Sequence, residues 1–215
     1  MQLYYLPGSP FSRVVRIVLL ELGVPVELVE ESEFPPRLVR GFNPAMQVPT
    51  LRDGDRSLFG TRIIAEYLMA ECPRPHRGSL PPFVVETARP SHRWRDAQLL
   101  VALEALLVAL VARSYLVWTG VEHRPDAAIN MNLAQRELER VYSLLDWLER
   151  DASPTGFRPG SFSLQDIWLI SAIGWTEARI KIQWRGRPRL ESIVEQFAER
   201  PSILATIPSA WHPGQ

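Results

Sequence analysis

Two serines close to the N-terminus are the residues whose type and position could carry chemistry. Ser9 and Ser12 follow the turn sequence Pro7-Gly8 and open an apolar run typical of a helix. A hydroxyl beside the free N–H groups of a helix start can help to hold an anion. Serine is also a preferred helix cap, so capping is the competing interpretation. The single cysteine, Cys72, excludes a disulfide scaffold and a cysteine zinc site.

The first 70 residues must supply the elements that position these serines, and they mix strand and helix patterns. A helix over residues 12–22 should end at Gly23, and the turn Asp53-Gly54-Asp55 should join two strands as a hairpin. The predicted elements are, in order, a strand at 3–6, the helix at 12–22, a strand at 24–29, a loop with a short helix at 30–42, the hairpin at 48–59 and a helix around 63–68.

The pattern changes after Cys72. Four prolines and a glycine follow it up to Pro82, which is the composition of a linker. Beyond this stretch the patterns are helical, with helices expected at about 84–118, 126–150, from 163 onward and at 190–199. The segment Ala97–Ala112 is apolar almost all round, but its 16 residues fall short of the about 20 that a membrane span needs. We therefore expect a buried helix, in a core or a subunit interface, and no membrane role.

Composition narrows the class of protein. The chain has 215 residues, with 24 basic and 24 acidic side chains and 46% hydrophobic residues, which is typical of a folded globular protein. Zero net charge and no long basic run argue against a nucleic-acid-binding protein. The first residues lack the basic and apolar regions of a secretory signal, so we expect a cytoplasmic protein. The broad apolar surface of the helix around Ala97–Ala112 also predicts a homodimer.

Three local motifs occur in a fixed order along the chain. They are Ser9-Pro10-Phe11-Ser12-Arg13-Val14-Val15-Arg16, Asn43-Pro44-Ala45-Met46-Gln47-Val48-Pro49-Thr50-Leu51, and Phe162-Ser163-Leu164-Gln165-Asp166-Ile167 with Arg200-Pro201-Ser202 after it. With these motifs the chain resembles the cytosolic glutathione transferase family over nearly its whole length, and its bacterial serine-type members in particular. The resemblance implies an α/β thioredoxin-like, glutathione-binding domain at 1–73, a linker at 74–83 and an all-α domain at 84–215. It also implies a cytoplasmic homodimer with a role such as detoxification.

The first motif holds the catalytic residue of such proteins. By the resemblance Ser9 would hydrogen-bond the glutathione sulfur and favour its thiolate, and Ser12 is the alternative hydroxyl. The third motif is structural by its pattern, because Ser163 and Asp166 have the spacing of a capping box. The basic residues between 179 and 189 are expected to form a solvated face.

The remaining glutathione contacts follow from the resemblance as well. Pro49 matches a cis-proline, Val48 would offer its backbone to the cysteinyl part, and Gln47 would contact the glycyl end. Thr61 could receive the γ-glutamyl carboxylate at a helix start. Gly60 stands where many members carry an acid for the ammonium group. An acid of a partner subunit, Asp96 or Glu104, could replace it.

A second pocket should lie between the two predicted domains and take a small hydrophobic electrophile. Phe11, Tyr115 and Trp118 are the candidates for its lining, with Trp175 a further one, and core packing is the competing interpretation for each aromatic residue. Glutathione would be the co-substrate, and no metal is expected. The leading hypothesis is therefore a glutathione transferase-like enzyme. The alternative is a non-catalytic protein of the same fold that binds a partner and has weak or lost affinity for glutathione.

Overall fold

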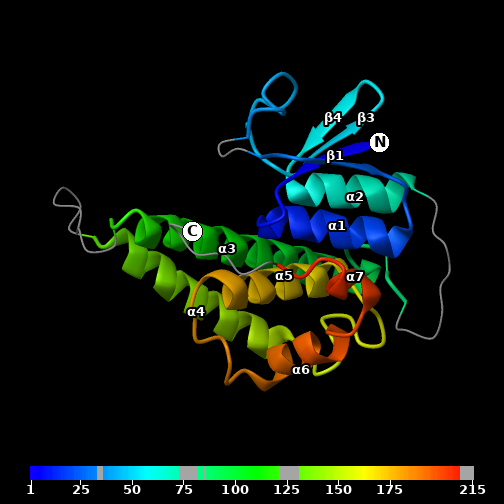
Figure 1. The fold of residues 1–215 in the computed structure, drawn as a ribbon. Coiled ribbons are helices and arrows are strands. Elements are labelled where there is room, and N and C mark those ends of the chain that lie inside the picture. Colours follow the sequence, from blue (N-terminus) through cyan, green and yellow to red (C-terminus); the bar gives the residue numbers. More distant parts are fainter. Residues whose placement is uncertain (33–35, 73–81, 85, 122–130, 209–215) are drawn as a thin grey trace.

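The N-terminal part of the chain is a four-stranded mixed sheet with two helices on one face (Figure 1). The computed structural model describes residues 1–32, 36–72, 82–84, 86–121 and 131–208. The sheet has the order β2-β1-β3-β4, in which β1 and β2 are parallel and the other neighbours are antiparallel. Its elements are β1 (Gln2–Tyr5), α1 (Pro10–Leu22), β2 (Glu27–Glu30), β3 (Thr50–Asp53), β4 (Arg56–Phe59) and α2 (Thr61–Glu71).

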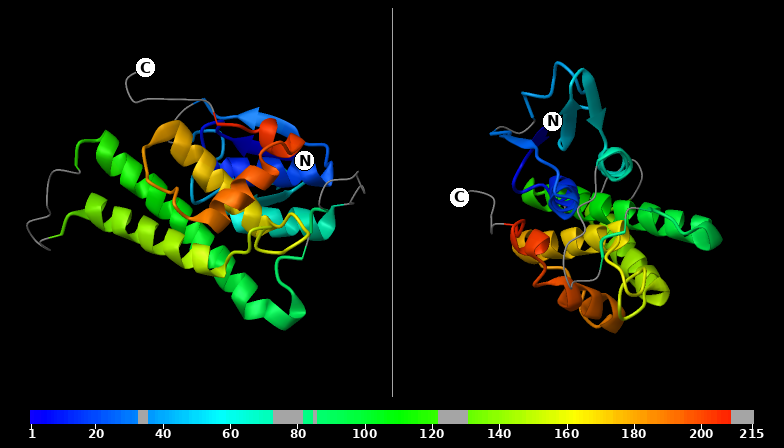
Figure 2. Two further views of the ribbon diagram at one scale, coloured as in Figure 1. Left: turned by 90° about the horizontal axis from the view of Figure 1, so that it is seen from below. Right: turned by 90° about the vertical axis from the view of Figure 1, so that its right-hand side faces the viewer.

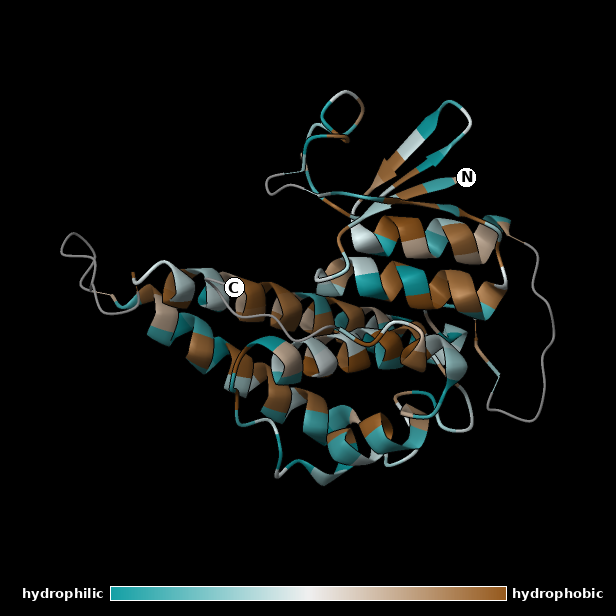
Figure 3. Cartoon of the chain, in the orientation of Figure 1, coloured by the Kyte–Doolittle hydropathy of each residue, from teal (hydrophilic) through white to brown (hydrophobic). Residues whose placement is uncertain are grey.

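The rest of the chain is helical and packs beneath α1 and α2 (Figures 1 and 2). A short 3-10 helix η1 (Pro90–His92) leads into α3 (Arg93–Trp118), and the elements that follow are α4 (Leu133–Asp151), α5 (Leu164–Arg179), α6 (Pro188–Phe197) and α7 (Pro201–Leu204). Buried apolar residues of both parts form one continuous cluster. Hydrophobic residues are accordingly dense on α1, α3 and α5 (Figure 3). The predicted α/β thioredoxin-like fold with an all-α C-terminal region is confirmed.

Local sequence explains the ends of α1. Ser9 caps its start, and Pro10 occupies the first position, where a missing N–H costs no hydrogen bond. Gly23 ends it with a φ of 65°, a left-handed conformation that glycine adopts without a steric penalty. This helix stop and the hairpin of β3 and β4 are as predicted.

Several predicted boundaries are wrong. The long helix was expected from Val84 but begins at Arg93, because the residue before Pro90 is disfavoured in a helix and the chain pairs elsewhere. The N–H of Val84 donates to the carbonyl of Phe162 at 2.9 Å, and the N–H of Phe162 donates to that of Pro82 at 2.9 Å. Within residues 36–42 the chain forms turns and no helix, and α7 was not predicted.

The predicted domain limits stay a prediction. Residues 73–81 of the expected linker at 74–83 lie outside the described residues. The start of the helix expected at 126–150 also lies outside them, and α4 is described from Leu133.

The length argument about the apolar helix needs correction. From Pro90 to Trp118 it is long and apolar enough to cross a membrane, a test that core helices of water-soluble proteins also pass. In this fold α3 packs against α4 and α5, and its fully buried leucines belong to the common core. Packing within the protein accounts for the buried part of α3, which is 44% of its most apolar window, and the length of the helix does not exclude a span.

Candidate active site

Four helix ends meet on one side of the molecule. The N-termini of α1 and α2 lie on the side where α3 and α5 end (Figure 1). Ser9 and Thr61 stand at the two helix starts, and Trp118 is the last residue of α3. Two helix N-termini present N–H groups that favour a bound anion.

Ser9 is the N-cap of α1 and is half-buried. Its hydroxyl oxygen accepts the N–H of Ser12 at 3.2 Å, so Ser9 caps the helix, as the competing interpretation predicted. A hydroxyl still has one O–H to donate while its oxygen accepts, so capping and anion binding are compatible. The hydroxyl of Ser12, in contrast, is completely buried and accepts the N–H of Leu6 at 3.4 Å.

The loop with Gln47, Val48 and Pro49 is held by one buried side chain, that of Asn43. The Asn43 amide nitrogen donates to the carbonyl of Gln47 at 2.8 Å and to the hydroxyl of Thr50 at 2.7 Å. Its amide oxygen accepts the N–H of Ala45 at 2.8 Å. The sequence motif contained Asn43 but gave it no role, and the structure identifies it as the residue that positions this loop.

This loop presents backbone and side-chain groups that fit the predicted contacts. The Val48–Pro49 peptide bond is cis, as predicted. Within the described part of the chain no hydrogen bond engages the N–H or C=O of Val48, so both groups are available to a ligand. The side chain of Gln47 is exposed.

Gly60 caps α2 without a side chain, and its carbonyl accepts the N–H of Ile64 at 3.0 Å. Its φ of 86° and ψ of 116° are closed to most other residues. Thr61, 7% exposed, is the first residue of the helix. The geometry thus shows why glycine stands here, although many members of the resembled family carry an acid at this position.

The predicted aromatic residues separate into two groups. Tyr115 and Trp118 form an edge-to-face pair with ring centres 5.7 Å apart, and Trp118 lies 6.2 Å from Trp175. Phe11 instead packs edge-on against the buried ring of Trp168 at 6.2 Å and belongs partly to the core. Burial raises the pKa of the Tyr115 phenol, so it stays protonated near neutral pH.

Two residues of α5 connect this aromatic group to the turn before Ser9. The indole N–H of Trp175 donates to the carbonyl of Gly8 at 3.0 Å. Arg179, one helical turn further on, covers the same glycine: a Cβ added to Gly8 would lie 2.6 Å from its Nη2 atom. Burial lowers the pKa of Arg179. Sequence reasoning placed Arg179 on a solvated face, which is wrong, and no local pattern connects it to Gly8.

Two further arginines of that segment, Arg185 and Arg187, are held in ion pairs. Arg185 pairs with Glu177 at 3.1 Å, and Arg187 pairs with Asp146 at 2.6 Å. Lys181, Arg185 and Arg189 are exposed, as expected for a solvated face, and Arg187 is half-buried.

The structure also bears on the two acids, Asp96 and Glu104, that were suggested as replacements from a partner subunit. Asp96 is completely buried, and its carboxylate accepts the backbone N–H of Arg89 at 2.8 Å and a guanidinium N–H of that residue at 2.6 Å. It is therefore occupied within its own subunit. Glu104 is half-buried on α3.

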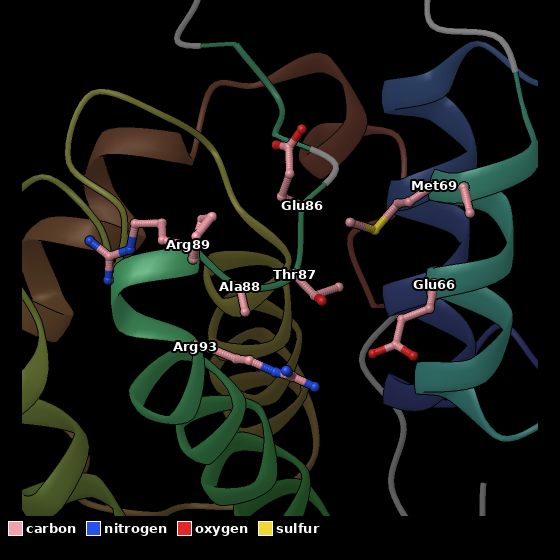
Figure 4. A pocket seen from close by; sticks show the side chains of 9 residues that line it. Glu66, Met69, Glu86, Thr87, Ala88, Arg89 and Arg93 are labelled. Carbon is pink, nitrogen blue, oxygen red and sulfur yellow. The ribbon is translucent and has the colours of Figure 1, made fainter.

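A cavity of about 510 Å³ lies elsewhere, between the second half of α2 and the start of α3 (Figure 4). Glu66 reaches toward it from α2 and Arg93 from α3. Glu66 is already paired with Arg62 at 2.8 Å. Because this cavity is at the far end of α2 from Thr61, it is separate from the site around Ser9.

The third motif has the structural role that its pattern predicted. Ser163 and Asp166 form a complete capping box at the start of α5. The Asp166 carboxylate accepts the N–H groups of Ser163 and Phe157, each at 2.9 Å. Burial raises the pKa of Asp166 to about 6 despite these hydrogen bonds.

Comparison with known proteins agrees with this fold and site. Residues 3–76 match the family described as glutathione S-transferase, N-terminal domain. Over nearly the full length, the chain is similar to the uncharacterized GST-like protein YibF of Escherichia coli, with 28% identity covering 93% of this chain and 95% of that protein. It is also similar to a glutathione S-transferase from Methylobacterium radiotolerans crystallised with glutathione sulfonate, with a TM-score of 0.74, 25% identity, and 98% and 95% of the two chains covered.

A second likeness is confined to one part of the chain. It is 44% identical to a stringent starvation protein A homolog of Haemophilus ducreyi over 78 residues, which are 35% of this chain and 36% of that protein. The N-terminal domain match and the full-length relatives define the class as a GST-like protein with a thioredoxin-like N-terminal region. Residues 3–76 thus match a glutathione S-transferase N-terminal domain, and the chain as a whole is GST-like.

Proposed function

We propose that this protein is a serine-type glutathione transferase that uses the Ser9 hydroxyl to stabilise the thiolate of glutathione. The observation that carries the proposal is the position of Ser9: a half-buried hydroxyl at the start of α1, next to the turn that Trp175 and Arg179 contact. The complete burial of Ser12 favours Ser9 over it. The glutathione sulfonate bound in the crystal structure of the similar Methylobacterium transferase supports the choice of co-substrate.

The remaining contacts are those expected for glutathione bound with its sulfur at Ser9. Val48 would pair its backbone with the cysteinyl part, Gln47 would contact the glycyl end, and Pro49 would hold the turn between them. The N–H groups around Thr61 would receive the γ-glutamyl carboxylate. The thiolate sulfur would then form a bond to an electrophilic carbon of a small apolar substrate, against Tyr115 and Trp118. The leaving group departs with its electron pair, and the thiol proton passes to solvent.

Calorimetric titration with glutathione tests this proposal directly, because it needs no knowledge of the natural electrophile. We expect saturable binding that glutathione sulfonate abolishes by competition. Absence of both binding and turnover with a chlorodinitrobenzene substrate would overturn the transferase proposal.

The alternative, a non-catalytic binding protein, is favoured by the glycine at position 60. Gly60 leaves the γ-glutamyl ammonium without a carboxylate at that position, and loss of one charge-assisted hydrogen bond costs about 10- to 150-fold in affinity. Part of the chain is also similar to a stringent starvation protein A homolog, which is not described as a transferase. A folded protein without glutathione affinity would favour a non-catalytic binding role.

We also propose a cytoplasmic homodimer that pairs through α3. Trp94, Val101 and Val108 recur every seven residues along this helix and are 78%, 49% and 45% exposed. Such a stripe of apolar side chains is typical of a helix that packs against a second surface. Light scattering at micromolar concentration should give twice the mass of the 24.5 kDa chain. A monomer would contradict the proposal.

A further inference from the structure

Arg179, the last residue of α5, lies against the turn that precedes Ser9. The Arg179 guanidinium lies over Gly8, with Cζ 3.4 Å from the position of an added Cβ. A side chain at position 8 would have to displace this guanidinium. Ser9 is the next residue, with its Cα about 3.8 Å from that of Gly8. A cation is therefore held within reach of the atoms that would react at Ser9.

Apolar surface accompanies this charge. Trp175 and Arg179 are four residues apart and lie on the same face of α5. Through Trp175 the face continues to Trp118 and Tyr115, whose exposed fraction is 42%. The rings of Tyr115 and Trp118 stand at 84° to each other and Trp175 is buried, so Tyr115 and Trp118 are the aromatic side chains left for a ligand to contact. Apolar side chains of this kind near a guanidinium are complementary to an apolar molecule that carries a carboxylate.

We propose that Arg179 is a specificity-determining residue that selects electrophiles with an apolar, aromatic body and a carboxylate. This inference rests on the proposed transferase function and adds an anionic group to the substrate class. The carboxylate would bind the guanidinium, the ring would lie on Trp118 and Tyr115, and the reactive carbon would face the sulfur at Ser9.

A pair of substrates that differ in one charge tests the proposal. The first is a chlorodinitrobenzoate with its carboxylate para to the chlorine, and the second is its methyl ester. In both reactions the carbon–sulfur bond forms, the carbon–chlorine bond breaks, and chloride leaves with the electron pair. We expect Arg179→Gln to lower kcat/KM for the benzoate at least tenfold more than for the ester. Arg179→Lys should retain part of the preference because it keeps the charge.

The control variant is Arg185→Gln, which removes one positive charge from the same segment. Arg185 is exposed and pairs with Glu177, so its loss should leave the ratio of the two substrates unchanged. Equal losses for benzoate and ester in Arg179→Gln would overturn the proposal and assign Arg179 to the thiolate. A loss of thermal stability without any change in the ratio would assign it to the C-terminus of α5.

A binding measurement separates this inference from the transferase proposal. Quenching of tryptophan fluorescence by dinitrobenzoate, and by its methyl ester, can be followed in the protein without glutathione. Arg179→Gln should weaken binding of the benzoate about tenfold or more and leave binding of the ester unchanged. If this holds while glutathione does not bind, the anion site stands and the transferase function fails. If glutathione binds but the protein shows no preference for the benzoate, the inference about Arg179 fails alone.

Discussion

Ser9 has two roles that a single substitution cannot separate. Its oxygen caps α1 through the N–H of Ser12, and its O–H is the donor proposed for the thiolate. Ser9→Ala should therefore lose both, with about 0.5–2 kcal/mol of stability from the cap and a higher pKa of the bound glutathione thiol. Ser9→Asp keeps a strong cap but replaces the donor with a negative charge.

The two variants together give the test. We expect Ser9→Asp to remain as stable as the wild type in thermal unfolding and to lose turnover at least as completely as Ser9→Ala. Thiolate absorbance of the complex with glutathione should show the rise in thiol pKa. Full turnover by the Ser9→Asp variant would show that Ser9 is only a cap.

Gly60 illustrates how backbone conformation limits a side chain. Its φ of 86° makes any other residue strained by about 1–3 kcal/mol, a cost to folding stability that the free and the bound protein share. A new carboxylate would separately contribute about 1.5–3 kcal/mol to binding. We expect Gly60→Ala to lower the free energy of unfolding by about 1–3 kcal/mol. Gly60→Glu should bind glutathione about tenfold more tightly than Gly60→Ala by calorimetry. Equal affinities of the two variants would mean that no carboxylate is missing there.

At the scale of elements, the capping box of α5 makes the protein's stability depend on pH. The pKa of Asp166 is raised from 3.8 to about 6 in the folded protein, so the folded state holds its proton more tightly. The contribution of Asp166 to stability is complete below pH 4 and is lost as the pH rises through about 6. The difference in unfolding free energy between wild type and Asp166→Asn should fall by roughly 3 kcal/mol between pH 3 and pH 7. Urea denaturation at both pH values measures this difference, and a difference that rises with pH would contradict the raised pKa.

Elements set by neighbouring residues were predictable, whereas those set by distant contacts were not. The stop at Gly23 and the capping box each depend on residues within one helical turn, which the sequence displays directly. The start of α3 depends on the pairing of Val84 with Phe162, far along the chain. The site divides in the same way, since Ser9 stands in a local motif but Trp175 and Gly8 are 167 positions apart. Physical reasoning from single segments cannot find such a contact.

At the scale of the whole molecule, one buried ion pair fastens the C-terminal segment to the N-terminal part. The Arg200 guanidinium donates to both carboxylate oxygens of Glu21 on α1, at 2.7 and 2.6 Å, and the hydroxyl of Ser202 donates to the same carboxylate. The two charged side chains are only 7% and 9% exposed. Removal of one partner would leave the other charge buried without compensation, which costs more than the pair contributes.

This imbalance predicts a distinctive pattern in a double-mutant cycle. Glu21→Leu and Arg200→Met should each lower the free energy of unfolding by about 3–5 kcal/mol, while the double variant should recover much of that loss because no buried charge remains. The exposed pair Arg62–Glu66 is the matched control, and Arg62→Met should cost less than about 1 kcal/mol. Denaturant unfolding of the four variants measures all these values. Losses that simply add in the double variant would show that Glu21 and Arg200 act independently, and would contradict the mutual compensation of the buried pair.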